Sequence, residues 1–328
     1  MGTANEPNHA IAATRRLIPG PTISLLCSVT LIVLVALVAL VAPFAGASRA
    51  AGLDTATLAE RYELLRPRMG TSPFDRPLVV DSGDDGGRIH GEIHGELDTP
   101  FAPLVAGLTS PDEWCALIAL HINVKACTQE HTTEGDFLTV YSGHKVFEPI
   151  QSARAIRYSF LVSTARYDYI KVVLAAPTGP LGTREYEVAF EAMPIGGHTF
   201  VALSYAFRPS AASRVATAAY LATTGNNKAG FTIVGRGSDG RPKWIGGLRG
   251  IVERNAMRNF LALEAWLETR DVAAADRLER RLECMAALTA RYPVQLVEMP
   301  AAEYVAIKRR EWREHTERVV GAIEEQRG

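Results

Sequence analysis

The stretch GGLRGIVERNAMRNFLALEAWLETR, from Gly246 to Arg270, decides the fold that this sequence predicts. Its opening glycines are followed by apolar residues at helical spacing, which is typical of a helix that lies against a sheet. The apolar face consists of Leu248, Val252, Ala256, Leu263, Trp266 and Leu267. Short strands precede this stretch in succession, so we expect the helix to cover one strongly curved antiparallel sheet.

Two amides, Asn255 and Asn259, interrupt this apolar face. They are four residues apart and so project from the same side of a helix, where a buried amide needs hydrogen-bond partners. Two interpretations stand: they anchor the polar part of a bound molecule, or they bond to the backbone of the inserted hairpin before the helix. Arg254 and Arg258 lie at the edge of the face, where each would pair with a ligand's carboxylate or phosphate, or with Glu191 or another surface acid.

The composition excludes several classes of protein. The chain has 328 residues, a net charge of -1 and 22% charged residues, which argues against a nucleic-acid binder. The sequence contains no P-loop, Rossmann glycine motif, HExxH or GxSxG, and it predicts neither a cofactor nor a metal site. Its histidines are scattered, so no catalytic residue is assigned.

The N-terminal region predicts export. Residues 1–21 are polar, include Arg15 and Arg16, and are expected to form a cytoplasmic tail. Residues 22–47 carry no charge and exceed the ~20 apolar residues that span a bilayer as a helix. The arginines favour an orientation with the bulk of the chain outside the cytoplasm, and the small residues at the far end also fit a cleavage site. We therefore expect a signal peptide or a membrane anchor, and a domain that is periplasmic or faces the periplasm from the inner membrane.

The rest of the chain divides into three parts. Residues 51–87 are expected to form a lead-in helix, capped by Asp54 and ended by Pro67, and then a linker. Residues 88–270 form the main domain: a strand at 88–98, two short helices at 100–108 and 111–120, six more strands, an insertion at 208–245 with a helix and a hairpin, and the long helix. The six strands are expected at 124–130, 136–146, 154–164, 167–175, 185–193 and 199–207. Residues 271–328 are a helical extension whose last helix is charged nearly all round and is expected to be solvated.

This order resembles the helix-grip fold of the START-like (SRPBCC) superfamily, which includes the birch-pollen-allergen proteins, lipid-transfer START domains and polyketide cyclases. The resemblance rests on residues 95–101 running into 110–114, on the strand pair 184–193 and 198–207, and on the helix at 247–267. It covers residues 88–270 and implies an α+β fold with a hydrophobic cavity between a seven-stranded sheet and the helix. The segments HINVKAC and GPLGTREYEV also resemble an uncharacterised group of exported bacterial proteins.

Cys115 and Cys127 lie at the second short helix and the strand after it. Outside the cytoplasm such a pair forms a disulfide that joins helix to sheet, and the alternatives are two independent buried thiols or a metal site. Cys27 and Cys284 are expected to stay unpaired.

The favoured hypothesis is an exported domain that binds a hydrophobic or amphipathic small molecule, such as a lipid. Asn255, Asn259 and Arg258 would anchor its polar part, and Tyr186 and Tyr205 on the last two strands complete the expected ligand-binding set. The alternatives are a cyclase- or hydrolase-type enzyme on the same fold and an envelope interaction module whose cavity is filled by side chains. An open cavity of a few hundred Å³ would favour the first two, and an inward acid or histidine beside the asparagines would favour the enzyme.

Overall fold

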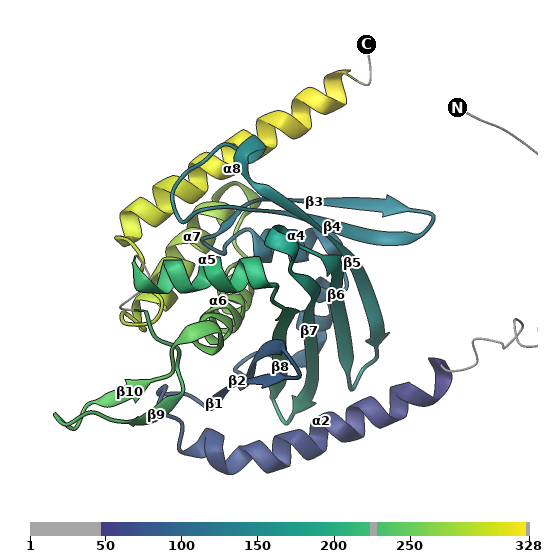
Figure 1. Cartoon of the computed structure of the whole chain (residues 1–328). Helices are drawn as coiled ribbons and strands as arrows, with labels where there is room; N and C mark the ends of the chain where they lie inside the picture. The colour runs from purple at the N-terminus through teal and green to yellow at the C-terminus, as the bar shows by residue number, and fades with distance from the viewer. Residues whose placement is uncertain (1–46, 224–227, 326–328) are drawn as a thin grey trace, which may run out of the picture. The chain divides into compact units, whose positions relative to one another are not determined.

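The computed structural model describes residues 47–223 and 228–325, and these have an α+β fold (Figure 1). Eight strands form one antiparallel sheet in the order β1-β2-β8-β7-β6-β5-β4-β3. They are β1 (Leu78–Asp85), β2 (Arg88–Leu97), β3 (Val124–Thr132), β4 (Gly135–Ser142), β5 (Arg154–Ala165), β6 (Ile170–Thr178), β7 (Arg184–Ile195) and β8 (His198–Arg208).

The helices are α2 (Ala47–Gly70), α3 (Phe101–Leu108), α4 (Pro111–Ile118), α5 (Ala211–Ala222), α6 (Gly247–Thr269), α7 (Ala274–Ala290) and α8 (Ala301–Glu325). Single 3-10 turns lie at Ile150–Ser152 and Pro180–Gly182, and the hairpin of β9 (Ile233–Arg236) and β10 (Pro242–Trp244) precedes α6. From β2 to α6 the chain forms one strand, two short helices, six strands, the insertion with α5 and the β9–β10 hairpin, and the long helix, so the predicted helix-grip order is confirmed.

The sheet has one strand more than the sequence predicts. Residues 78–85 were expected to belong to a linker, but they form β1, which pairs with β2 from Leu78↔Gly95 to Asp85↔Arg88. The turn between the two strands places Gly86 and Gly87 at positive φ, which glycine adopts without strain. Only three consecutive apolar residues mark β1 in the sequence, and the turn-rich DSGDDGG that follows them concealed the strand.

Helix α6 packs directly on β2 and β8 and forms the centre of the core. A side chain at Gly91 of β2 would collide with the backbone of Val252, so this glycine allows the helix to approach the strand closely. The buried side of α6 includes the predicted Val252, Ala256, Leu263 and Trp266, and also Met257, Phe260 and Leu261. The helix is therefore more deeply enclosed than a one-sided amphipathic pattern indicates.

Helix α2 covers part of the opposite face of the sheet, over β1, β7 and β8 (Figure 1). Leu58 and Met69 of this helix are buried against Phe200 and neighbouring strand residues, and Arg61 forms an ion pair with Glu191 on β7 at 2.9 Å. The helix differs from the predicted one at both ends. It begins at Ala47 rather than after Asp54, and Pro67 lies inside it because only one backbone hydrogen bond near its end is lost.

Helix α8 is not the solvated tail that its charge pattern predicts. Tyr304, Lys308 and Glu311 are buried, and Glu311 accepts hydrogen bonds of 2.7 Å from both Lys125 on β3 and Lys308. The Tyr304 hydroxyl donates to the backbone oxygen of Leu120 at 2.7 Å. One face of the helix therefore docks on the sheet through paired charges. The number of charged residues alone predicts solvent exposure, because it does not show that these charges are paired and buried.

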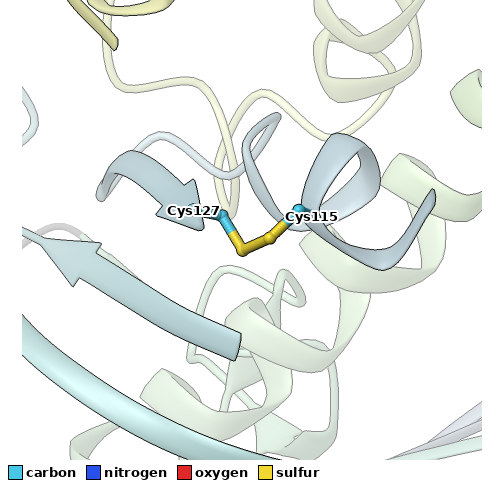
Figure 2. Close-up of a disulfide and its surroundings, with 2 residues drawn as sticks. All are labelled: Cys115 and Cys127. Atoms are coloured by element: carbon cyan, nitrogen blue, oxygen red, sulfur yellow. A yellow bond between two sulfur atoms is a disulfide. The ribbon is translucent and has the colours of Figure 1, made fainter. Parts of the chain in front are cut away.

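A disulfide joins Cys115 on α4 to Cys127 on β3, with the two Cα atoms 5.2 Å apart (Figure 2). Both residues are buried, and the bond ties the short helix to the strand beside it. Cys284 carries a free thiol, whereas Cys27 lies outside the described residues.

The expected tail at 1–21 and signal peptide or anchor at 22–47 lie outside the described residues, apart from Ala47 at the start of α2. Within the described ranges, none of the helices combines the length and the apolar composition that a membrane crossing requires.

Candidate functional site

A cavity of about 420 Å³ lies between the sheet and α6. Its volume falls in the range of small-molecule sites, which is roughly 300–1,000 Å³. Residues of β3 to β8 form one wall, and α4, the loops after α4 and β4, the end of α5 and the middle of α6 form the other. The protein therefore has an open cavity of a few hundred Å³, the feature expected of a ligand-binding domain and not of a core filled by side chains.

The wall contributed by the sheet is apolar and aromatic. Its aliphatic part consists of Val124, Val140, Ile156, Leu174, Val188 and Leu203, and Phe190 and three tyrosines complete it. Tyr186 lies between Tyr158 and Tyr205, with ring centroids 6.4 Å from each. Its hydroxyl donates to Thr183 at 2.9 Å. This wall can cover a large apolar surface of a ligand.

Four polar side chains of the cavity come from α6. Arg254, Asn255, Arg258 and Asn259 all line it, and Lys145 from the loop after β4 joins them. Arg254 and Arg258 are 3% and 4% exposed, so their guanidinium groups are almost wholly removed from water. Burial lowers the pKa of both arginines from the ordinary value, and for Arg258 the neighbouring Arg254 acts in the same direction.

One carboxylate behind the wall serves several of these cations. Glu298, in the loop between α7 and α8, lies 2.8 Å from Arg258, 2.7 Å from Lys145 and 3.6 Å from Lys228. Burial alone would raise the pKa of Glu298, but the three cations together hold it below its ordinary value. Glu298 is therefore ionised at neutral pH and compensates one positive charge of the group.

Arg254 has the weakest set of partners. Its guanidinium donates to the backbone oxygen of Ala229 at 3.4 Å and interacts with Tyr220, whose hydroxyl also accepts from Lys145 at 2.9 Å. Within residues 47–223 and 228–325, no carboxylate oxygen lies within 4.0 Å of it. A buried charge without such a partner is unfavourable until an anion reaches it.

His121 orients one of the asparagines. Its Nδ1 accepts a hydrogen bond of 3.2 Å from the backbone N–H of Asn123, so the ring proton is on Nε2, and the ring also bonds to Asn255. Asn255 therefore faces both the His121 ring and the cavity. Burial, with Arg258 and Lys308, lowers the pKa of His121 to about 3, so the ring is neutral at physiological pH.

This histidine is the feature that would favour an enzyme over a binding domain. Both of its ring nitrogens are engaged by protein groups, and a ring that is neutral down to about pH 3 takes up a proton poorly at pH 7. The geometry supports a role in holding Asn255 rather than in proton transfer.

The segment before α6 is held by Glu253 and not by the asparagines. This carboxylate is fully buried and accepts from the backbone N–H groups of Phe231 and Thr232 at 2.6 and 2.9 Å, and from the hydroxyl of Ser82 on β1 at 2.5 Å. In the described chain, neither Asn255 nor Asn259 makes a hydrogen bond to the β9–β10 hairpin. Among the described residues, the hydrogen bonds that hold this segment to α6 come from Glu253.

All five residues of the expected ligand-binding set lie on this one cavity: Asn255, Asn259, Arg258, Tyr186 and Tyr205. Glu191, an expected partner of the arginines, lies instead with Arg61 on the opposite face of the sheet. Sequence reasoning missed His121 as an orienting group, Lys145 and Glu298, because loops bring these residues to the cavity and no periodic pattern marks them.

A second hollow of about 890 Å³ lies near the end of β2 and α7. Its wall contains Arg76 and Glu264, which bond to each other, together with Glu268 and Arg291. These charges are paired within the protein or exposed, so the smaller cavity is the better candidate for an apolar ligand.

No protein-family model matches the chain, and no curated protein is similar to it in sequence. Among solved structures, CalU16 from Micromonospora echinospora is similar over 65% of this chain and 96% of its own, with 9% identity and a TM-score of 0.30. A conserved protein of unknown function from Enterococcus faecalis covers 65% of this chain and 91% of its own, with 11% identity and a TM-score of 0.30. The human StarD13 lipid transfer and protein localization domain covers 44% and 80%, with 8% identity and a TM-score of 0.26. These likenesses carry no argument about function, and the fold class rests on the topology of this chain itself.

Proposed function

We propose that this domain binds a small molecule with a large apolar part in the cavity between the sheet and α6. The observation that carries the proposal is a cavity of about 420 Å³ with an aliphatic and aromatic wall on one side and hydrogen-bond donors on the other. The apolar part of the ligand would lie on the sheet, and Asn255, Asn259 and Arg258 would hold its polar part. A lipid is one class of molecule that fits this description.

A cavity-filling variant tests the proposal. In Val188→Trp the indole would occupy the space that the ligand needs, whereas Val215→Trp places the same ring on the exposed surface of α5, where Val215 is 71% exposed. The parent and Val215→Trp should bind the neutral fluorophore 1-aminoanthracene with a blue-shifted emission, and Val188→Trp should lose about tenfold or more in affinity. Equal affinity in Val188→Trp would place the probe elsewhere and contradict the proposal.

We also propose that the domain works outside the cytoplasm. The uncharged segment at 22–47 after Arg15 and Arg16 supports this, and so does a disulfide, since such bonds persist in oxidising compartments. A reporter that is active only after export, fused behind Gly328, should be active in cells. Activity of a cytoplasmic reporter alone at the same position would refute the orientation.

A further inference from the structure

We propose that the polar side of the cavity selects ligands with an anionic head group, a carboxylate or a phosphate monoester, attached to the apolar body. This inference rests on the proposed function and names the class of ligand that the same cavity takes. It follows from the charges on the wall, from the direction of its hydrogen bonds and from a comparison with a second buried cluster in which cations share one carboxylate.

The charge balance of the cavity is positive. Arg254, Arg258 and Lys145 line it, while no aspartate or glutamate among the described residues does. Glu298 lies behind the wall and is shared by Arg258, Lys145 and Lys228, so one negative charge faces several positive charges. A ligand that brings one or two negative charges completes this set.

The charged groups on the wall are donors only. Arginine and lysine side chains have no acceptor atoms, and the amides of Asn255 and Asn259 each offer an NH₂ group beside their oxygen. An oxyanion offers several lone pairs to such groups and takes short, charge-assisted hydrogen bonds from them. A hydroxyl or an ester carbonyl would satisfy fewer of these donors.

The cluster of Lys125, Lys308 and Glu311 is an example, in this protein, of buried charges whose hydrogen bonds are all made within the protein. There, two buried ammonium groups share one carboxylate at 2.7 Å each, and both also donate to backbone oxygens, those of Val146 and Val124. Arg254 has instead one backbone bond of 3.4 Å and the hydroxyl of Tyr220. The group at the cavity is therefore incomplete without a further acceptor, and its open side is the cavity.

The size of the ligand follows from the volume. At about 30 Å³ for each water-sized group, 420 Å³ holds about fourteen such groups, which corresponds to a twelve-carbon chain with its head group. Dodecanoate, dodecyl phosphate and dodecanol form a matched series that differs only in the head group. Acetate and inorganic phosphate supply the same anions without an apolar body.

Calorimetric titration of the purified full-length protein at pH 7 tests the selection. Dodecanoate or dodecyl phosphate should bind about tenfold or more tightly than dodecanol. Arg254→Met should weaken binding of the anions by about thirtyfold while leaving the affinity for dodecanol unchanged. The matched control Arg214→Met removes the same charge from an exposed site on α5 and should change neither affinity.

The remaining outcomes separate the two proposals. If dodecanol binds as tightly as the anions and Arg254→Met has no effect, selection for an anion is overturned while the cavity remains a binding site. If none of the three chains binds, the proposed function itself fails. If acetate or phosphate displaces dodecanoate or dodecyl phosphate at equal concentration, the site binds a free anion, and the proposal of an amphiphilic ligand is overturned. Dodecanol binding reports whether the cavity is intact. If Arg254→Met no longer binds dodecanol, the affinities for the anions and for dodecanol are compared in Lys145→Met instead, with the same expected result.

Discussion

The ammonium nitrogen of Lys125 on β3 lies 2.7 Å from a carboxylate oxygen of Glu311 on α8, and both side chains are buried. The second oxygen of Glu311 accepts from Lys308 at the same distance. These contacts join a helix near the end of the chain to a strand whose first residue, Val124, lines the cavity. The helical extension is therefore part of the structure that shapes the site.

Removing Glu311 should destabilise the protein strongly, because it leaves two buried ammonium groups without their anion. Glu311→Leu is expected to lower the free energy of unfolding by about 3–5 kcal/mol, measured by urea denaturation. The triple variant Lys125→Met, Lys308→Met, Glu311→Leu removes all three charges together and should regain most of that loss. A single variant within about 0.5 kcal/mol of the parent would show that α8 does not depend on this cluster.

The disulfide should stabilise the fold by limiting the unfolded chain. Replacing Cys115 and Cys127 by alanine is expected to lower the free energy of unfolding by about 2–3 kcal/mol, and Cys284→Ala should have no comparable effect. Denaturant unfolding of the oxidised protein, with peptide mapping under non-reducing conditions, measures both. Full alkylation of Cys115 and Cys127 in the unfolded, unreduced protein would show that the bond does not form.

The two asparagines should differ in their contributions to stability. Asn255→Leu removes the partner of the buried His121 ring and should cost about 1–3 kcal/mol of unfolding free energy. In the described chain Asn259 has no hydrogen-bond partner on the protein, so Asn259→Leu should leave the melting temperature unchanged or higher while weakening ligand binding. A marked fall in the melting temperature of Asn259→Leu would identify this residue as a structural tie.

Acidification should weaken the fold through His94. Burial, with Arg61 and Arg68, lowers its pKa to about 4, against the opposite effects of Asp81 and Glu191. Between pH 6.5 and about 4 the unfolded chain then binds more protons than the folded one. The free energy of unfolding therefore decreases by about 3 kcal/mol as the pH is lowered through this window. His94→Phe keeps a ring stacked on Phe200 but cannot titrate.

The measurement is the difference in urea stability between parent and His94→Phe from pH 7 to pH 4. Contributions from His121 and from the carboxylates are common to both proteins and cancel in this difference. The parent should lose stability relative to the variant as the pH falls. If the free energies of unfolding of the two proteins change in parallel with pH, the lowered pKa of His94 is contradicted.

The sequence predicts the fold well where its patterns are local and periodic. Alternation along β7 and the Gly196–Gly197 turn set the β7–β8 hairpin, which the structure pairs from Arg184↔Arg208 to Ile195↔His198. The apolar spacing of α6 likewise identifies the helix and places both asparagines and Arg258 on one wall.

The remaining parts depend on tertiary contacts between distant segments. Glu298 and Lys145 lie in loops, 153 residues apart, and only folding brings them to Arg258. The buried face of α8 is charged, so hydrophobic periodicity cannot reveal it, and Glu253 is distinguished from a surface acid only by the donors that surround it. Such groups are recognised once the backbone path is known, because their partners come from other elements.

The most direct test of the central claim is to locate a bound chain by methyl NMR of the full-length protein. Addition of dodecanoate should shift the methyl resonances of Leu174, Val188 and Leu203 on the cavity wall, at a stoichiometry of one. It should leave those of Leu58 on α2 and Val79 on the strand beneath it unchanged. Saturable shifts confined to the cavity set are the predicted result. Shifts of the α2 set alone, or none at a dodecanoate concentration that saturates binding by calorimetry, would contradict a ligand site under α6.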